Sequence, residues 1–547
     1  MDTGTQVPTI EPEVAQDTRG IGGHPRGLTT LFFTEMWERF SYYGMRALLV
    51  LFMKAPVAEG GLGFDTLKAA SIYGTYTGAV YLMSVPGGWV ADNILGARLA
   101  VLIGGIIIAL GHFSMAIPSV SSFYAGLVLI VIGTGLLKPN ISTMVGALYG
   151  ERDNRRDGGF SIFYMGINIG ALVAPLVCGT LAQTDWFKNI LQRAGFNPEG
   201  SWHWAFGAAG VGMTLGLVQY LISAKRVQHV GNRPQKKPRL AAHERAAHQA
   251  TAKASSVAVV LNVATLFFWT ICLLIGAVTI TRLALYFSGN HSGHGIQPTD
   301  AFFYMYLAAI SALLAIIARY IHGVVASGEA ERAKEESKRL LVIMVLFFFS
   351  ILFWMAFEQA GSSLNLFADK LTNNNVFGKP FASSYYQSVN SLFLIALAPV
   401  FSWIWIGLGD RGPSSPAKFS YGLLFVGLGF VVVAYASSLT GAGKVGPSWL
   451  VTVYLLHTIG ELCLSPVGLS TVTKLAPPKL VGLMMGVWFL SISLGNYTGG
   501  VIAGNFDETA EGALVKLFGY VALITIGAGG LLALLTPYVR KLMGRVH

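Results

Sequence analysis

The chain has 547 residues, of which 53% are hydrophobic and 12% charged, and its mean hydropathy is +0.57. These values exclude an ordinary soluble domain and indicate a membrane protein. The formal net charge of +11 could suggest nucleic-acid binding, but the basic residues gather in polar segments that follow apolar runs. That placement is typical of positively charged cytoplasmic loops, so no nucleic-acid partner is expected.

The three cysteines, Cys178, Cys272 and Cys463, lie inside apolar runs and have neither paired nor metal-ligand spacing. We therefore expect no disulfide and no metal site. The polar segments contain no nucleophile and base at a catalytic spacing and are too short for a soluble domain. An enzyme is not expected.

Residues 1–27 are polar and contain prolines and glycines, which predicts a cytoplasmic N-terminal tail without a cleavable signal peptide. A helix needs roughly 20 mostly apolar residues to cross the hydrocarbon core, and its backbone groups must be satisfied within the helix. A six-helix bundle is therefore predicted over 28–223, from apolar runs near 28–53, 67–90, 98–117, 121–147, 160–183 and 203–223.

The rest of the chain predicts a basic cytoplasmic linker (224–256), an extra transmembrane hairpin (257–325), a charged cytoplasmic connection (326–339), a second six-helix bundle (340–540) and a cytoplasmic tail (541–547). The fold class is an all-α membrane protein with fourteen transmembrane helices. With both termini in the cytoplasm, every strongly basic connection lies on one side. Two six-helix bundles are the plan of a transporter that rocks around a site near the midplane.

Two similar turns follow the second helix of each bundle, "GGWVADNILGAR" (87–98) and "GLGDRGP" (407–413). Each turn combines Gly, Asp and Arg between two helices. An acid near a helix end can pair with a basic residue and lock a closed state. We therefore expect Asp92 and Arg98 to belong to a cytoplasmic gate.

The first predicted helix carries four charges in "TEMWERFSYYGMR" (34–46), although one ionisable side chain at a helix centre costs roughly 2.5 to 3.5 kcal/mol. At about 100° per residue these charges share one stripe with two tyrosines. The stripe must face protein or a polar interior, and it comprises Glu35, Glu38, Arg39, Tyr42, Tyr43 and Arg46. One interpretation is an ion-paired packing helix, but it leaves Arg46 without a local partner.

Three further charges lie in three other predicted helices: Lys138 in "GTGLLKPNIS" (133–142), Glu358, and Glu461 in "GELCLSPVGLS" (460–470). A proline closely follows Lys138 and Glu461, and it predicts a kink or a loosened turn because it removes a backbone donor. His457 lies four residues before Glu461 and could pair with it. A single histidine on an apolar face is more often a packing residue.

The pattern from Glu35 to Gly44 resembles the signature of the proton-coupled oligopeptide transporter family, within the major facilitator superfamily. The segments 87–98, 133–142 and 460–470 resemble further motifs of this family, as do "FSIFYMGINIGAL" (160–172), "FEQAGSSL" (357–364) and "YYQSVNSLF" (385–393). The resemblance spans all twelve core helices in order.

The resemblance implies symport of di- and tripeptides with protons by alternating access, without a cofactor. The peptide carboxylate would meet Arg46 and Lys138, and the amino group would meet Glu461. Hydrogen bonds to the peptide would come from Tyr43, Tyr81, Asn168 and Asn390, and pocket walls from Trp354 and Trp488. Proton coupling would involve Glu35, Glu38, Arg39 and Glu358, with Arg46–Glu358 closing the outer side and Lys138–Glu461 the inner side.

The second helix departs from the family pattern, because "IYGTYTGAVY" (72–81) has Gly74 where animal members carry a histidine. An outer gate between such a residue and an acid near Asp369 is therefore in doubt. The extra hairpin resembles that of bacterial members, which favours a bacterial inner membrane, and a monomer is expected. Two alternatives remain open: a family relative that carries nitrate or another small anion, and a drug or metabolite antiporter.

Overall fold

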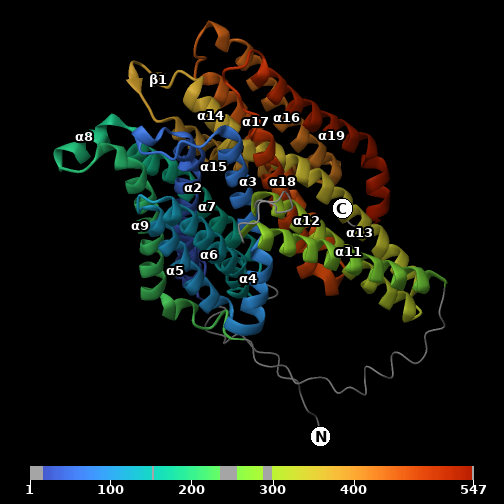
Figure 1. Cartoon of the computed structure of the whole chain (residues 1–547). Coiled ribbons are helices and arrows are strands. Elements are labelled where there is room, and N and C mark those ends of the chain that lie inside the picture. The colour runs from blue at the N-terminus through green and yellow to red at the C-terminus, as the bar shows by residue number, and fades with distance from the viewer. Residues whose placement is uncertain (1–16, 151–152, 234–255, 288–297, 545–547) are drawn as a thin grey trace.

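The computed structural model describes residues 17–150, 153–233, 256–287 and 298–544. Most of the predicted N-terminal tail, much of the linker, the loop of the extra hairpin and the last three residues lie outside these ranges. The described chain is almost wholly helical, as Figure 1 shows.

The first half of the chain forms helices that lie together on the left of Figure 1. They are α2 (Arg26–Lys54), α3 (Thr66–Leu82), α4 (Ser84–Val90), α5 (Ala97–Met115), α6 (Val120–Ala147), α7 (Arg156–Gln183), α8 (Asp185–Arg193) and α9 (Ser201–Ile222).

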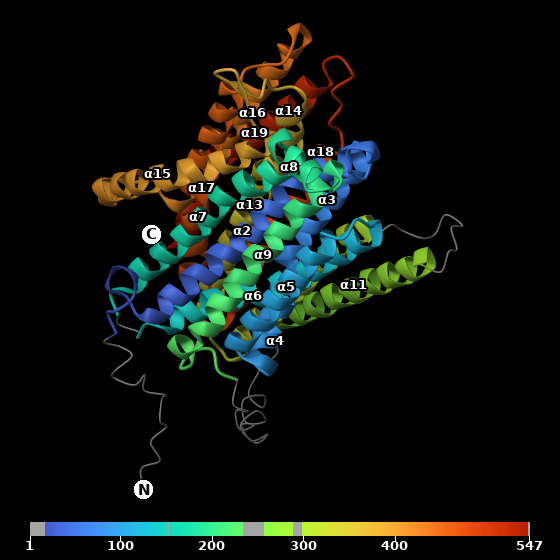
Figure 2. The ribbon, with the colours of Figure 1, turned by 90° about the vertical axis from the view of Figure 1, so that its left-hand side faces the viewer.

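The second half forms the yellow-to-red helices, most of which lie on the right of Figure 1. They are α13 (Ala330–Phe357), α14 (Ser363–Lys370), α15 (Tyr386–Leu408), α16 (Ser415–Ser438), α17 (Ser448–Leu475), α18 (Val481–Ala503) and α19 (Ala513–Met543), with a short antiparallel hairpin of β1 (Asn375–Val376) and β2 (Lys379–Pro380). Between the halves in sequence come α11 (Ser256–Phe287) and α12 (Pro298–Ala326). Figure 2 shows α11 at the edge of the molecule.

Twelve helices of the described chain are long and apolar enough to cross a membrane. The chain is therefore a multi-pass membrane protein. Two predicted spans are not among the twelve: α2 carries the four charges at 35, 38, 39 and 46, and α3 has only 17 residues.

The second predicted helix is interrupted rather than continuous from 67 to 90. It ends at Leu82, and α4 is followed by a π-helical turn, Ala91–Leu95. Pro86 explains the break, because it lacks the N–H that would bond to the Leu82 carbonyl. Gly87 then allows close packing against α6, since a Cβ there would meet the Gly135 carbonyl.

The charged run before α13 is helical from Ala330, although the sequence predicts a connection up to 339. Glu, Lys and Arg are good helix formers, and Arg332 pairs with Glu336 one turn later at 3.0 Å. At its other end α13 gives way to a 3-10 turn, Glu358–Gly361 (η6), before α14 begins. The first part of the second predicted bundle (340–540) therefore contains two helices joined by this turn.

Neither α8 nor the β1–β2 hairpin was predicted from the sequence. Both lie near the upper end of the molecule in Figure 1, where α14 also lies. We call this end, defined by α8, β1, β2 and α14, the hairpin end. The opposite end, defined by α4 and residues 224–233, is the linker end. Helices α6 and α17 continue through Pro139 and Pro466.

The two halves approach most closely where α3 lies beside α18. A Cβ on Gly74 would lie 2.7 Å from the Gly500 Cα, so neither position has room for a side chain. Gly74 is thus a packing residue in this chain. Near it, Tyr306 of α12 lies 2.8 Å from Ser493 Oγ of α18, and that hydroxyl donates to the Gly78 carbonyl of α3 at 2.6 Å.

Candidate functional site

The charged stripe of α2 begins with a compact buried cluster. Arg39 Nε lies 2.8 Å from Glu35 Oε1 and 2.9 Å from Glu38 Oε2, and all three side chains are almost fully buried. Gly170 of α7 makes this possible, because a Cβ there would lie 3.0 Å from the Arg39 Cβ. The predicted pairing of Glu35 with Arg39 is therefore present. Two carboxylates share one guanidinium, an arrangement that can gain or lose a proton.

One turn beyond Tyr42, Arg46 reaches the second half of the molecule. Its Nη2 lies 3.1 Å from Glu358 Oε1, and the exposed fractions of the two residues are 7% and 6%. Glu358 is the first residue of η6, so the break at the end of α13 presents its carboxyl toward α2. The predicted contact between Arg46 and Glu358 is formed.

Tyr73 completes this contact and was not predicted. Arg46 Nε donates to Tyr73 Oη at 2.8 Å, and the hydroxyl donates to Glu358 Oε1 at 3.1 Å. Nothing local in the sequence distinguishes Tyr73 from Tyr76 or Tyr81 on the same helix. Its role depends on the rotation of α3 against α2 and η6.

Lys138 lies on the first half of the molecule with its Nζ 3.4 Å from the centre of the Tyr81 ring. This is a cation–π contact, and it brings together two predicted binding residues. Glu461 accepts a hydrogen bond of 3.1 Å from Asn390 Nδ2, which also bonds to Thr458 Oγ1 at 3.0 Å. Within the described ranges no ion pair joins Lys138 to Glu461, so the predicted inner pair is not formed in this structure.

The remaining predicted binding residues have different surroundings. The Tyr43 ring centre lies 5.4 Å from the Arg46 Cζ. Asn168 Nδ2 donates to the Tyr164 carbonyl of its own helix at 2.9 Å. Trp354 packs edge-on against Phe357 at 5.4 Å.

Trp488 packs inside the second half of the molecule. It contacts Phe419 at 6.1 Å, and its ring occupies the space that a Cβ on Gly468 would need. The ring edge is therefore held by α16 and α17, and only 4% of the residue is exposed. Trp488 is still predicted to line the peptide pocket, but most of its ring packs against α16 and α17.

His457 packs between the rings of Phe357 and Phe430, at 6.2 and 5.1 Å. No hydrogen bond or ion pair between His457 and Glu461 occurs in the part of the chain that the structure describes, and Glu461 bonds to Asn390 instead. The packing interpretation of His457 fits this environment, since aromatic rings cover the imidazole.

Asp92 and Arg98, the residues expected at a cytoplasmic gate, do not pair with each other in the described structure. Arg98 Nη1 donates to the Gln228 carbonyl at 2.9 Å, and the Arg98 backbone N–H donates to Gly231. Asp92 is exposed, and among the described residues it forms no ion pair. The reason is local. Asp92 lies in the π-helical turn before α5, whereas Arg98 lies in the first turn of α5 and bonds to residues 228–231.

Two acids outside the membrane-spanning helices form hydrogen bonds with arginines at the linker end. Asp153 receives hydrogen bonds from the Arg155 side chain, which hold the pKa of that carboxyl below its ordinary value. Burial would raise the pKa of Asp17, but hydrogen bonds from Arg19 and Arg26 outweigh it and lower that pKa. Both acids are therefore charged at neutral pH and pair next to the start of α2.

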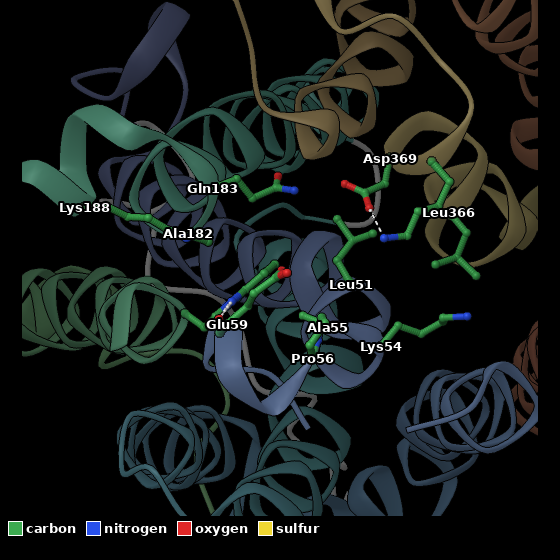
Figure 3. Close-up of a pocket in the computed structure, with 12 residues that line it drawn as sticks. Leu51, Lys54, Ala55, Pro56, Glu59, Ala182, Gln183, Lys188, Leu366 and Asp369 are labelled. Atoms are coloured by element: carbon green, nitrogen blue, oxygen red, sulfur yellow. Dashed lines mark hydrogen bonds and ion pairs between the residues drawn. The ribbon is translucent and has the colours of Figure 1, made fainter. Parts of the chain in front are cut away.

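A small cavity of about 170 Å³ opens at the hairpin end, as Figure 3 shows. Lys54 and Glu59 line it from the first half, and Asp369 and Lys370 line it from α14. Gln183 of α7 spans the two halves, because its Nε2 donates to Ser383 Oγ at 2.9 Å, and Ser383 bonds to Asp369. The cavity contains none of the predicted binding residues, so it lies apart from the charged site.

Comparison with known proteins places the chain in a recognised group. A family model described as the POT family matches residues 98–517. The peptide transporter YePEPT of Yersinia enterocolitica subsp. palearctica is 40% identical over 547 residues, 97% of each chain. The uncharacterized transporter YclF of Bacillus subtilis is 38% identical over 96% of each chain. A di-/tripeptide transporter of Lactococcus lactis subsp. cremoris is 36% identical, over 96% of this chain and 98% of the relative.

The solved structures that resemble this chain include transporters of the same family. The crystal structure of peptide transporter POT in complex with sulfate has a TM-score of 0.78 at 38% identity and covers 98% of this chain and 100% of the other. A POT family transporter in complex with a thioalcohol-conjugated peptide has a TM-score of 0.76 at 31% identity, covering 96% and 99%.

Proposed function

Because this chain belongs to the POT family of transporters, we propose that it imports di- and tripeptides together with protons by alternating access. As a POT family member it is a transporter and not an enzyme. The relatives named for peptide transport support the cargo, since the chain matches them over almost their whole length. The site that carries the proposal is the buried Arg46–Glu358 contact between the two halves.

The proposed architecture has fourteen spans, in two six-helix bundles with the α11–α12 hairpin between them. Both termini and the linker end face the cytoplasm, and the hairpin end faces outward. The concentration of basic residues in residues 224–256 and in the C-terminal tail supports this orientation. A bacterial inner membrane is the proposed location, and a monomer without cofactor is the proposed working unit.

The proposed peptide site uses opposite charges on opposite bundles. A peptide carries an anion and a cation at its two ends, so Arg46 and Lys138 would bind its carboxylate and Glu461 its amino group. Recognition of the termini allows many side chains. Tyr43, Tyr81, Asn168 and Asn390 would bond to the peptide backbone, while Trp354 and Trp488 would limit its side chains.

Proton coupling is proposed to act on the Arg46–Glu358 contact. A protonated Glu358 no longer holds the arginine by charge, so the hairpin end can open and Arg46 becomes available to the peptide carboxylate. The cluster of Glu35, Glu38 and Arg39 would carry the proton on the first bundle. One proton that enters down a 100 mV potential supplies about 2.3 kcal/mol, enough for a roughly fiftyfold concentration ratio.

The present conformation fits a state closed at the hairpin end. Asn365 of α14 donates to the Ala47 carbonyl at 2.8 Å, and Ser388 of α15 donates to Leu172 of α7 at 2.7 Å. Lys138 and Glu461 have separate partners. We propose that these two residues pair with each other when the hairpin end opens and the linker end closes.

The alternatives are transport of nitrate or another small anion, and drug or metabolite antiport. An anion carrier has no use for an acid that binds an amino group, and this chain keeps Glu461 beside Asn390. An antiporter with a wide apolar pocket does not require three charged residues around the substrate. Peptide symport therefore explains more of the charged residues in the site than either alternative does.

The test is uptake of radiolabelled dialanine by proteoliposomes. We expect uptake only with an inward proton gradient and its loss with a protonophore. Uptake that ignores the protonophore would contradict proton symport. Gradient-driven uptake of nitrate, with none of dialanine, would favour the anion alternative.

A further inference from the structure

We propose that Tyr73 is a positioning residue for transport: its hydroxyl orients Arg46 toward the peptide carboxylate and sets the pH at which Arg46 and Glu358 separate. The inference rests on the proposed function, because it assigns a role within the same coupling step. Tyr73 was not among the residues that the sequence analysis selected.

The geometry gives one carboxylate oxygen two donors. Arg46 Nη2 and Tyr73 Oη both lie 3.1 Å from Glu358 Oε1, and Arg46 Nε donates to the same tyrosine hydroxyl at 2.8 Å. Tyr73 is 1% exposed, so water does not compete for these bonds. Both donors belong to the first half of the molecule, and the acceptor belongs to the second.

Gly361 provides the space that this arrangement needs. A Cβ at this position of η6 would collide with the Tyr73 hydroxyl and would lie 3.1 Å from Arg46 Nε. The turn after Glu358 is therefore shaped around the hydroxyl. This observation is independent of the hydrogen bonds, since it concerns the backbone of the opposite half.

Other charged or titratable groups act on Glu358 only through longer-range electrostatics. They come from four helices: Tyr42 and Tyr43 of α2, Tyr81 of α3, Lys138 of α6 and Glu461 of α17. Among the described residues, only Arg46 and Tyr73 form an ion pair or a hydrogen bond with the Glu358 carboxyl.

Protonation of Glu358 changes the two contacts differently. The attraction between Arg46 and the carboxylate is lost, but the Tyr73 oxygen can still accept the hydrogen bond from Arg46 Nε. The arginine then keeps its position, with its Nη atoms free for a peptide carboxylate. While Glu358 is charged, the Tyr73 hydroxyl stabilises the carboxylate and so opposes protonation.

The test variant is Tyr73→Phe, which removes the hydroxyl and keeps the ring. A hydrogen bond to a charged group lost in the buried site corresponds to about one pH unit. We expect the midpoint of dialanine uptake against external pH, at fixed internal pH, to move about one unit upward, because protonation becomes easier. The KM for dialanine should rise about tenfold with little change in maximal rate.

Tyr76→Phe is the matched control. Tyr76 is a buried tyrosine one turn away on α3, and its hydroxyl has no hydrogen-bond partner among the described side chains. Its removal should leave the midpoint unchanged. Gly361→Ala should reproduce the upward shift by displacing the hydroxyl, and it serves as the second variant if Tyr73→Phe does not fold.

A double variant separates positioning from general damage. In a Glu358→Gln background the carboxyl that Tyr73 contacts is absent, so adding Tyr73→Phe should not shift the remaining pH profile. An unchanged midpoint in folded Tyr73→Phe, an equal shift in Tyr76→Phe, or a shift that persists with Glu358→Gln would each overturn the role of Tyr73. Failure of the proposed function would look different, because wild-type uptake would then not depend on the proton gradient.

Discussion

Arg46 of α2 and Glu358 of η6 form a buried ion pair, with 3.1 Å between Arg46 Nη2 and Glu358 Oε1. The two residues are 312 positions apart in the sequence and lie in different halves of the molecule. Leaving one charge of such a pair buried alone costs about 3 to 5 kcal/mol. If the Glu358 charge is removed, the molecule can avoid that cost by separating its two halves at the hairpin end, which exposes Arg46 to water.

Glu358→Gln should expose the hairpin end. A cysteine introduced by Leu51→Cys, in the wall of the hairpin-end cavity, should react with a membrane-impermeant maleimide several times faster in Glu358→Gln than in the otherwise unchanged protein. The background without Leu51→Cys controls for the native cysteines. Equal labelling rates in the two proteins would mean that the ion pair does not hold this end closed.

Lys138→Ala and Glu461→Gln should each abolish dialanine uptake, because each removes one of the charges proposed to bind a peptide terminus. Binding of dialanine to the purified variants should weaken at least tenfold, the effect of about 1.4 kcal/mol. His457→Ala is the control, since His457 packs against Phe357 and Phe430. Normal uptake by either charge variant would remove that residue from the proposed site.

Glu38→Gln should uncouple transport from the proton gradient. Glu38 shares Arg39 with Glu35 and is fully buried, so an uncharged amide keeps the shape but cannot release a proton. We expect exchange of internal for external dialanine to continue while gradient-driven accumulation is lost. Both activities are measured on the same proteoliposomes, and accumulation at the wild-type level would show that Glu38 is not required for coupling.

Gly74→Ala should destabilise the protein, although Ala normally stabilises a helix by about 1 kcal/mol relative to Gly. The new methyl group would lie 2.7 Å from the Gly500 Cα, and overpacking of this kind typically costs about 1 to 3 kcal/mol. Gly276→Ala on α11 is the control, because nothing lies within 4 Å of a Cβ there. The melting temperature in detergent should fall for the first variant only.

Much of the fold was predictable from the apolar runs. Helices α5, α6, α7 and α9 start and end within a few residues of the predicted runs. The failures have local causes that periodicity does not report: Pro86 interrupts the second helix, and the charged residues from 330 onward extend α13. The short helix α8 is amphipathic and too brief for a search based on membrane spans.

The site was predictable in part. Glu35 with Arg39 and Arg46 with Glu358 are in contact, as the sequence indicated. The hydrogen bond between Asn390 and Glu461 was not predicted. Tyr73 was missed, because a tyrosine in an aromatic-rich helix carries no signal of its own. The proposed pair of Lys138 with Glu461 is absent from the described structure, where Lys138 contacts Tyr81. Asp92 and Arg98, which were expected at a cytoplasmic gate, do not pair with each other there, and Arg98 binds residues 228–231.

The sequence alone determined that this is an all-helical membrane protein of the POT family and which charges require explanation. It could do so because long apolar runs must be helical in lipid and because each charge within them is costly. Only the tertiary structure decided which side chains meet. Tyr73 and Glu358 lie 285 residues apart, and their contact depends on how α3 is rotated against η6, which no local pattern encodes.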